Sequence, residues 1–255
     1  MPMDIFDAHF HIIDPAFPLV PNRGYTPPAF TAADYQAAAA PLGIVGGAVV
    51  SGSFQAFDQG YLAAALKLLG PRFVGVTQLE RSVSDQEILR LHGLGVRAVR
   101  FNLYRGGSED MGNARELGTR VHDLVGWHAE FYVDGKDIAT LSPLLIALPQ
   151  IVIDHLGMTA EGTNALVTLA EQGAKVKASG FGRVGLDVAA VMKRIAAANP
   201  HALMFGSDMP STRARRPFAP EDIATLVGAL GEADAKRALL LNASELYRPT
   251  RPAVA

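Results

Sequence analysis

Residues 7–11, Asp7-Ala8-His9-Phe10-His11, place two histidines at the end of the first apolar stretch of the chain. Side chains at alternate positions of a strand point to the same face, so we expect Asp7, His9 and His11 to project together. Two imidazoles directed at one point can bind a metal ion, or can polarise a substrate carbonyl group without one. A histidine pair buried only for packing is the alternative that this motif by itself leaves open.

Two later segments end in the same manner. Residues 151–157, Ile-Val-Ile-Asp-His-Leu-Gly, and residues 203–210, Leu-Met-Phe-Gly-Ser-Asp-Met-Pro, are apolar runs that end in ionisable side chains and then break at glycine or proline. Strands of a parallel barrel deliver catalytic groups to the barrel rim in this way. Three such endings in one chain favour a shared site over packing.

Apolar runs typical of strands alternate with helical patterns along the chain. The expected strands are Ile5–His9, Gly47–Val50, Phe73–Val76, Val96–Arg100, Ala129–Val133, Ile151–Asp154, Val176–Ala178 and Leu203–Phe205. The expected helices are Ala32–Ala40, Gln59–Leu69, Asp85–Leu94, Ala114–Val125, Ile138–Leu148, Glu161–Gln172, Leu186–Ala198, Pro220–Leu230 and Ala233–Leu241. Thr31, Asp58 and Ser84 are the expected N-caps.

Eight alternations predict an α/β fold, a (β/α)8 TIM barrel formed by a single domain over residues 1–255. The length also fits two smaller domains. An open doubly wound sheet is the second interpretation, but it would carry a glycine-rich turn directly after its first strand, where this chain has histidines. The Pro-rich loop from Ile12 to Phe30 is long enough to act as a functional lid.

Composition limits the class of partner. Hydrophobic residues make up 49% of the chain, and 23 basic residues stand against 25 acidic ones without a basic block, which disfavours nucleic acid. There are no cysteines, so disulfides and thiolate chemistry are excluded. The longest apolar tract is too short to cross a bilayer, and the N-terminus lacks a signal-peptide pattern, so we expect no membrane association and a cytoplasmic location.

Four segments together resemble the second large subgroup of the amidohydrolase superfamily. They are Phe6 to His11, Asp154 to Gly157, Gly206 to Pro210, and the terminal Asn242 to Tyr247. Within this subgroup the chain is most similar to the 2-pyrone-4,6-dicarboxylate lactonases and related lactone hydrolases, and the resemblance runs nearly end to end. It implies a distorted barrel and a hydrolase that opens a lactone.

The resemblance also implies roles for individual residues. Catalysis falls on His9, His11, His155 and Asp208, with the aspartate taking a proton from water while the histidines polarise the lactone carbonyl. The implied substrate contacts are Tyr25, Ser53, Arg100, Tyr132 and Arg183. Two arginines of the lactonases are missing here, because Met158 stands at one position and the other is replaced by Gly106 or displaced to Arg105. The pyrone dicarboxylate would therefore lose at least one bidentate clamp.

Lactone opening needs a nucleophilic water, a base and donors for the developing oxyanion, and these four residues can supply the base and the donors. Two metals are disfavoured, because the fourth and fifth strands end in Arg100 and Tyr132 instead of the bridging and histidine ligands of binuclear members. We expect a reaction without a cofactor. A single Zn²⁺ or Mn²⁺ held by His9, His11, His155 and Asp208 is the open alternative.

Further alternatives concern function and partners. A metal-dependent decarboxylase of an aromatic or unsaturated acid is the second function, and a phosphate-binding barrel that uses Gly180, Gly182 and Gly185 is the third. The expected ligand is a small anionic lactone or carboxylic acid, and a homo-oligomer stays open. The residues expected to be structural or on the surface are His92, His122, His128, His201, Arg105, Arg213, Arg215 and Arg216.

Overall fold

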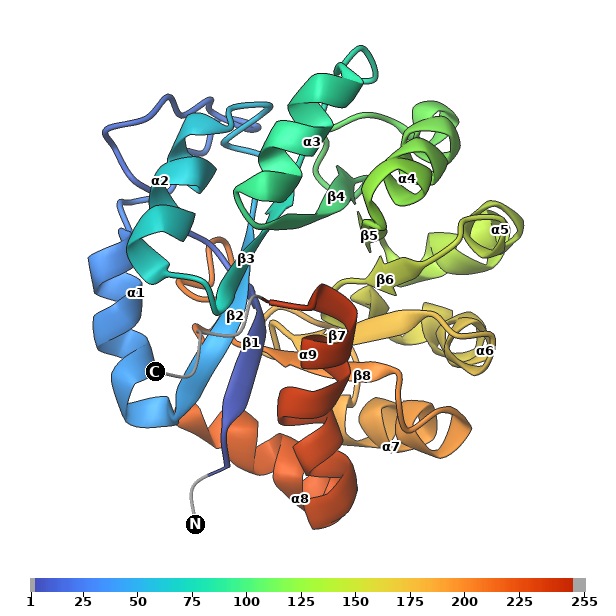
Figure 1. Cartoon of the computed structure of the whole chain (residues 1–255). Coiled ribbons are helices and arrows are strands. Elements are labelled where there is room, and N and C mark those ends of the chain that lie inside the picture. Colours follow the sequence, from blue (N-terminus) through green and yellow to red (C-terminus); the bar gives the residue numbers. More distant parts are fainter. Residues whose placement is uncertain (1–2, 250–255) are drawn as a thin grey trace.

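Residues 3–249, which the computed structural model describes, form one eight-stranded parallel sheet with helices around it (Figure 1). The strands follow the chain order and are β1 (Ile5–Phe10), β2 (Ile44–Val50), β3 (Phe73–Thr77), β4 (Val96–Asn102), β5 (His128–Tyr132), β6 (Ile151–Ile153), β7 (Lys175–Ser179) and β8 (Leu203–Gly206). The helices are α1 (Ala32–Ala39), α2 (Gly60–Leu69), α3 (Asp85–Gly93), α4 (Met111–Val125), α5 (Gly135–Ile146), α6 (Thr163–Glu171), α7 (Val188–Ala198), α8 (Pro220–Lys236) and α9 (Asn242–Tyr247).

The first and last strands meet and nearly close the sheet. Asp208 N donates to His9 O at 2.7 Å, and His11 N donates to Met209 O at 2.8 Å. These bonds join the end of β1 to the segment after β8, so candidate residues 199 positions apart in sequence lie together. The predicted (β/α)8 barrel is confirmed.

The apolar core has two layers. Phe6, Val50, Val76 and Met204 belong to a cluster inside the barrel. A larger cluster that includes Trp127 lies between the strands and the surrounding helices. Both faces of the strands are therefore buried, as the near-continuous apolar strand sequences predict.

An irregularity in β1 changes the direction of one predicted side chain. Asp7 pairs with Gly47 and Phe10 with Val49, so β1 has one extra residue between these two pairs. Asp7 consequently does not project with His9 and His11, and that expectation was wrong. Its carboxylate instead accepts hydrogen bonds from Ser207 N at 2.8 Å and from the Tyr35 hydroxyl at 3.1 Å.

The N-terminal caps of the helices largely agree with those expected from the sequence. Thr31 and Ser84 cap α1 and α3, each by accepting a backbone N–H three residues on. Asp58 lies one residue before the structural N-cap of α2, Gln59. The two helices expected after residue 220 meet at Gly231, which lies inside the range of α8 but has a non-helical backbone with a φ of 73° and a ψ of 171°, so the expected break is present.

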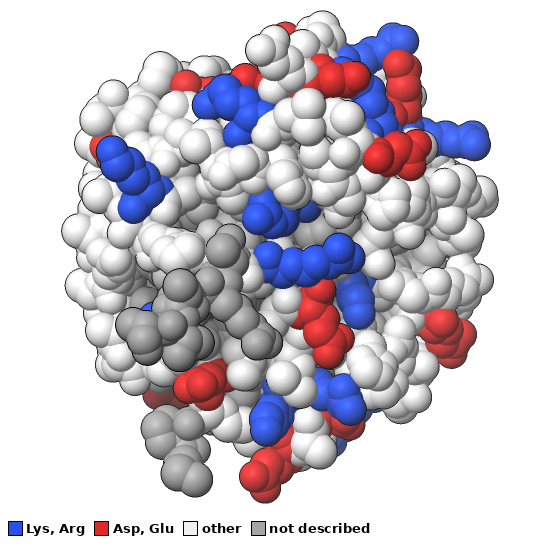
Figure 2. All heavy atoms as spheres, in the orientation of Figure 1, with Lys and Arg blue, Asp and Glu red and all other residues white. Residues whose placement is uncertain are grey.

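Short turns complete the chain, and they are the 3-10 helices Ala40–Leu42, His155–Gly157 and Ala160–Gly162 and the π-helix Arg237–Leu241. The last helix, α9, lies across the end of the barrel at which the strands begin (Figure 1), and its Tyr247 stacks on Phe6 at 5.5 Å between ring centroids. Basic and acidic side chains are interspersed over the face seen in Figure 2. Within residues 3–249, no helix is long and apolar enough to cross a membrane.

Candidate functional site

Three imidazoles surround one carboxylate oxygen at the carboxyl ends of the strands. The Nε2 atoms of His9, His11 and His155 lie 3.9, 3.7 and 3.9 Å from Asp208 Oδ1. All four side chains are buried. His9 Nε2 and Asp208 Oδ1 have no hydrogen-bond partner among residues 3–249, so the structure leaves polar atoms available at this point. We call these four residues the reactive group.

Two members of the reactive group stand on strained backbone. His155 has a φ of 51° and Asp208 a φ of 60°, which is a left-handed backbone conformation that residues other than glycine rarely adopt. Backbone hydrogen bonds hold both turns, from Met158 N to His155 O at 2.9 Å and from Ser211 N to Asp208 O at 2.6 Å. Strain of this kind persists where the surroundings determine the geometry, and it is frequent at functional sites.

Arg183 holds the other oxygen of the same carboxylate. Its Nε donates to Asp208 Oδ2 at 2.7 Å, and its Nη2 contacts the same atom. Burial alone would raise the pKa of Asp208, but Arg183, together with the histidines, holds that pKa well below its ordinary value. Asp208 is therefore ionised at neutral pH, with Oδ2 occupied and Oδ1 directed at the imidazoles.

Each imidazole is fixed through its second nitrogen. His11 Nδ1 lies 2.7 Å from the carbonyl oxygen of Val50, and His155 Nδ1 lies 2.9 Å from the Ser179 hydroxyl. Burial lowers the pKa of His9 to about 3; the charge of Asp154 opposes this shift and that of Lys177 adds to it. Burial also lowers the pKa of His155 well below its ordinary value. Both of these imidazoles are neutral in the folded protein.

A small pocket opens beside the reactive group. It is lined by His11 and His155 and by the five residues expected to contact substrate, which are Tyr25, Ser53, Arg100, Tyr132 and Arg183. Tyr25 comes from the Pro-rich loop, so part of that loop lines the pocket. The five residues that the sequence analysis proposed as substrate contacts therefore line one pocket in the fold.

Two arginines assigned to the surface also line this pocket, and that expectation was wrong. Arg213 lies over the Tyr25 ring, with 4.4 Å between its guanidinium carbon and the ring centroid, and donates to Asn22 Oδ1 at 3.1 Å. Arg105 lies over the Tyr104 ring at 5.3 Å. Neither pairs with a carboxylate in the described part of the chain. Both cations are therefore available to an anionic ligand.

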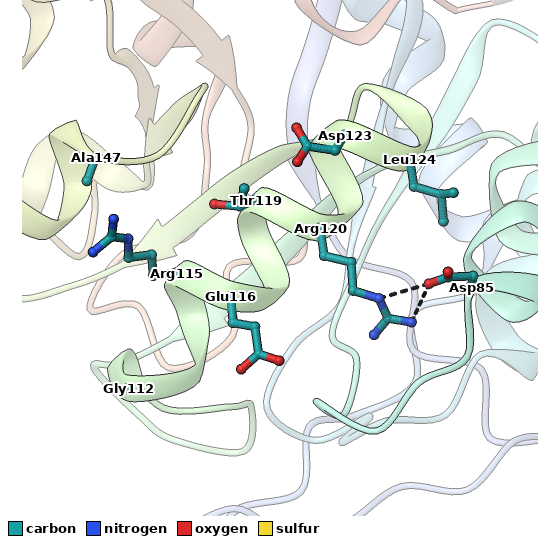
Figure 3. Close-up of a pocket in the computed structure, with 9 residues that line it drawn as sticks. All are labelled: Asp85, Gly112, Arg115, Glu116, Thr119, Arg120, Asp123, Leu124 and Ala147. Atoms are coloured by element: carbon teal, nitrogen blue, oxygen red, sulfur yellow. Dashed lines mark hydrogen bonds and ion pairs between the residues drawn. The ribbon is translucent and has the colours of Figure 1, made fainter.

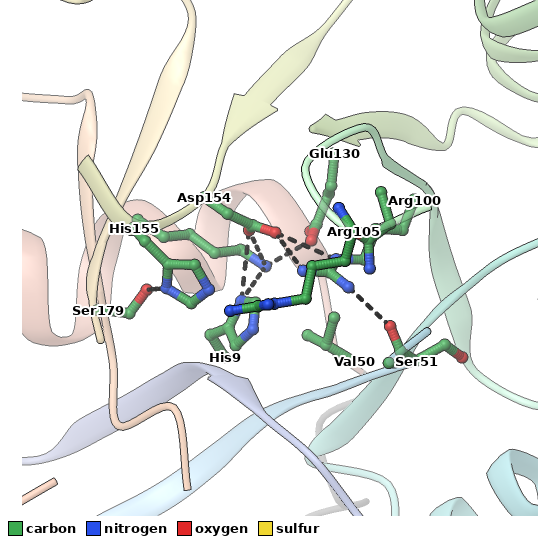
Figure 4. Close-up of polar contacts among 12 residues, drawn as sticks. His9, Val50, Ser51, Arg100, Arg105, Glu130, Asp154, His155 and Ser179 are labelled. Atoms are coloured by element: carbon green, nitrogen blue, oxygen red, sulfur yellow. Dashed lines mark hydrogen bonds and ion pairs between the residues drawn. The ribbon is translucent and has the colours of Figure 1, made fainter. Parts of the chain in front are cut away.

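A buried charge network lies against the reactive group, and sequence reasoning missed most of it. It consists of Arg100, Glu130, Asp154 and Lys177, all of them buried, and Figure 4 labels Arg100, Glu130 and Asp154. Arg100 Nη2 donates to Asp154 Oδ2 at 2.8 Å, and Lys177 Nζ contacts Glu130 and lies 3.5 Å from Asp154 Oδ1. Arg100, expected to contact substrate, thus already has a carboxylate partner. The available signal was a charged residue between two apolar ones in each of two strands, Glu130 between Ala129 and Phe131 in β5 and Lys177 between Val176 and Ala178 in β7.

Comparisons with known proteins show the family of this chain. The model of the amidohydrolase family matches residues 6–248. The chain belongs to the amidohydrolase family. It is 34% identical over 162 residues to a 2-pyrone-4,6-dicarboxylate hydrolase of Comamonas testosteroni, a match that covers 62% of this amidohydrolase and 53% of that protein.

Two further relatives extend over the whole chain. A D-galactarolactone isomerase of Agrobacterium fabrum is 24% identical over 269 residues, which covers 97% of this amidohydrolase and 92% of the isomerase. The crystal structure of a putative 2-pyrone-4,6-dicarboxylic acid hydrolase from Pseudomonas putida superposes with a TM-score of 0.81 at 26% identity, covering 97% of this chain and 98% of that one.

Donor atoms of this amidohydrolase fit a single divalent cation. One atom each of His9, His155 and Asp208 lie within 4.8 Å of one another, and His11 Nε2 lies beside them. Imidazole nitrogen and carboxylate oxygen are the ligands that Zn²⁺ and Mn²⁺ take, and the partnerless atoms His9 Nε2 and Asp208 Oδ1 are in position to provide them.

Glycines after β7 serve packing in this amidohydrolase. A side chain at Gly180 would meet His155 Nδ1 at 2.9 Å, and one at Gly182 would meet the backbone oxygen of Arg216 at 1.9 Å. The N–H groups of Arg183 and Gly185 donate to backbone oxygens, so they are not directed at a phosphate. These contacts argue against the phosphate-binding alternative.

A larger groove lies on the outside of the barrel (Figure 3). Its lining comes mainly from α4, with Arg115, Glu116 and Asp123 along the helix, and Arg120 donates to Asp85 at 2.8 Å. No residue of the reactive group lines it. Its charges are those of a solvated helix surface.

Proposed function

We propose that this amidohydrolase opens a lactone of a carboxylated or sugar-acid type by attack of a water molecule that Asp208 activates. The observation that carries the proposal is the convergence of three imidazole Nε2 atoms on Asp208 Oδ1 beside a pocket lined by arginines. The names of two relatives, a pyrone-dicarboxylate hydrolase and a galactarolactone isomerase, support this substrate class, because a 2-pyrone and a galactarolactone are both lactones.

The geometry assigns a role to each oxygen of Asp208. Oδ2 is held by Arg183, and Oδ1 accepts a proton from water while the water oxygen bonds to the lactone carbonyl carbon. Imidazole N–H groups stabilise the negative charge that develops on the carbonyl oxygen. The bond between the carbonyl carbon and the ring oxygen then breaks, and the ring oxygen takes up the proton. The products are a carboxylic acid and an alcohol or enol.

Anion recognition falls to the two arginines without carboxylate partners. Arg213 and Arg105 lie at the pocket lining beside Tyr25 and Tyr104, and a guanidinium binds a carboxylate through two parallel hydrogen bonds. Met158, which stands where the lactonases carry an arginine, is buried and cannot replace this contact. We propose that Arg213 and Arg105 hold the carboxylate of the substrate.

A metal-dependent decarboxylase is the second candidate, and the clustering of His9, His155 and Asp208 is the observation that favours it. These residues with His11 would hold the cation, which as a Lewis acid would stabilise negative charge on substrate oxygens. His11 and His155 would keep the ring orientation set by Val50 O and Ser179 Oγ.

Hydrolysis of a panel of lactones, including 2-pyrone-4,6-dicarboxylate and sugar-acid lactones, tests the proposal. Wild type and Asp208→Asn are compared after exhaustive chelation and after addition of Zn²⁺ or Mn²⁺. We expect wild type to turn over at least one lactone and Asp208→Asn to lose about 10³-fold or more in kcat, the upper range for a general base. Asp187→Asn, at the N-cap of α7, is the matched control because asparagine also caps helices.

Each outcome separates the candidates. Turnover by the chelated wild type supports Asp208 as a base without a metal, and activity that returns only with metal makes the reactive group a ligand set. Turnover of carboxylic acids with release of CO₂, and of no lactone, would replace the hydrolase with the decarboxylase.

A further inference from the structure

Lys177 is the one lysine on β7 that lies wholly inside the barrel, and it touches the reactive group. Its side chain is fully buried, and its Nζ atom lies 3.3 Å from His9 Nδ1. The same Nζ contacts Glu130 and lies 3.5 Å from Asp154 Oδ1. Two buried carboxylates thus face two cations, Lys177 and Arg100, so the network is balanced when Lys177 is an ammonium ion.

An ammonium group can only donate hydrogen bonds, because it has three N–H groups and no lone pair. Its partner at His9 must therefore be a lone pair on Nδ1. Asp154 Oδ1 also lies 3.3 Å from His9 Nδ1, but it has no hydrogen bond of acceptable geometry with any described residue. An Nδ1 proton on His9 would in addition point at the N–H groups of Lys177. The contacts therefore leave the single proton of a neutral His9 on Nε2.

His11, unlike His9, is held with a proton on Nδ1. Its Nδ1 lies 2.7 Å from the carbonyl oxygen of Val50, which only accepts, so Nδ1 of His11 carries a proton. The Nδ1 atoms of the two histidines of β1 thus have different roles, because that of His9 accepts from Lys177 and that of His11 donates to Val50. A nitrogen that carries a proton cannot coordinate a metal ion.

We propose that Lys177 is a positioning residue that fixes His9 with its proton on Nε2, so that His9 serves as the hydrogen-bond donor to the carbonyl oxygen of the substrate. The role in catalysis rests on the proposed function, whereas the proton position does not. Metal binding through His9 would require the proton to move to Nδ1 and to face Asp154 and Lys177. Lys177 therefore weakens metal binding at this site.

The proton position is measured directly on the wild-type protein. Nitrogen-15 NMR of the chain labelled in its histidine rings distinguishes a protonated Nε2 from a protonated Nδ1, and the His9 signals are assigned by their absence in His9→Asn. We expect His9 to be protonated on Nε2 and His11 on Nδ1. A wild-type His9 protonated on Nδ1 would overturn the proposal, whether or not any lactone is turned over.

A double variant that leaves the net charge of the network unchanged tests the effect of Lys177 on catalysis and on metal binding. Lys177→Met combined with Glu130→Gln removes one cation and one carboxylate together, and Lys175→Met, on the same strand and bonded to His201 O, is the control. We expect the double variant to lose about 10- to 100-fold in kcat with little change in KM, and to bind Zn²⁺ about 10- to 100-fold more tightly in calorimetric titration after chelation. Unchanged Zn²⁺ affinity with an unchanged His9 spectrum would contradict the proposal. If the double variant does not fold, the wild-type spectrum alone decides.

Discussion

The reactive group and the buried charge network lie side by side in the same barrel, but they differ in how far their buried polar atoms are paired. In the network, Arg100, Glu130, Asp154 and Lys177 all pair with oppositely charged neighbours, and even Asp154 Oδ1, which has no hydrogen bond in residues 3–249, lies 3.5 Å from Lys177 Nζ. In the reactive group, His9 Nε2 and Asp208 Oδ1 are buried without a hydrogen-bond partner in the described chain. Unpaired buried polar atoms cost stability, whereas complete networks fix geometry. We infer that the network holds the shape and that the reactive group keeps its binding capacity for the substrate.

The largest expected effect separates the two regions by stability. Lys177→Met leaves Glu130 without its cation, and breaking a buried pair by removing one partner costs about 3–5 kcal/mol. Asp208→Asn also removes one partner of an ion pair, with Arg183, but it should cost less, because the amide oxygen can still accept from Arg183 and Arg183 lines the pocket. Urea unfolding of both variants measures the difference. Equal losses from Lys177→Met and from the control Lys175→Met would show that the network does not stabilise the fold.

The barrel was predictable because the information for it is local. Each strand is a short apolar run, each helix carries its own periodicity, and Thr31 and Ser84 are caps recognisable from sequence. The ends of β1, β6 and β8 could also be recognised, because a charged side chain after an apolar run stands out. All four members of the reactive group follow from such endings.

The charge network could not be predicted in the same way, because its members come from four strands and depend on which side chains point inward. Lys177 and Glu130 are 47 residues apart, and only the barrel register brings them together. The direction of Asp7 was missed because one extra residue in β1 reverses the alternation, and nothing in the local sequence marks it. Arg213 was assigned to the surface because its place at the pocket depends on contacts with Asn22 and Tyr25.

Arg213, unlike Arg100 and Lys177, is a cation without a carboxylate partner in residues 3–249. Arg213→Met removes a guanidinium that has no carboxylate partner in the described chain, so stability should change little while KM for a carboxylated lactone rises by about 10- to 100-fold. The value of kcat should stay within a few-fold, because this contact is equally strong in ground state and transition state. Steady-state kinetics provide the measurement, and Arg215→Met, an exposed neighbour, is the control. A fall in kcat at constant KM would place Arg213 in the chemistry instead of in substrate binding.

The smallest expected effect concerns the free energy of unfolding below neutral pH and its dependence on His128. Burial lowers the pKa of His128; Glu130 opposes this shift, and Lys177 and Arg248 add to it. His128 is therefore neutral in the folded protein, whereas in the unfolded chain it takes up a proton as pH falls below about 6.5. The unfolded state then binds more protons, so the free energy of unfolding should fall as pH decreases from 7 to 5, by at most about 1.4 kcal/mol per pH unit from this group.

His128→Gln should flatten that slope, since glutamine keeps a donor near Glu130 Oε1 but has no proton to bind. His201→Gln removes an exposed imidazole and is the control. Urea unfolding at several pH values gives the slopes. A slope in His128→Gln equal to that of wild type would mean that Glu130 keeps a proton on His128 in the folded state, which would turn the network from a neutral arrangement into one with an excess cation beside Glu130.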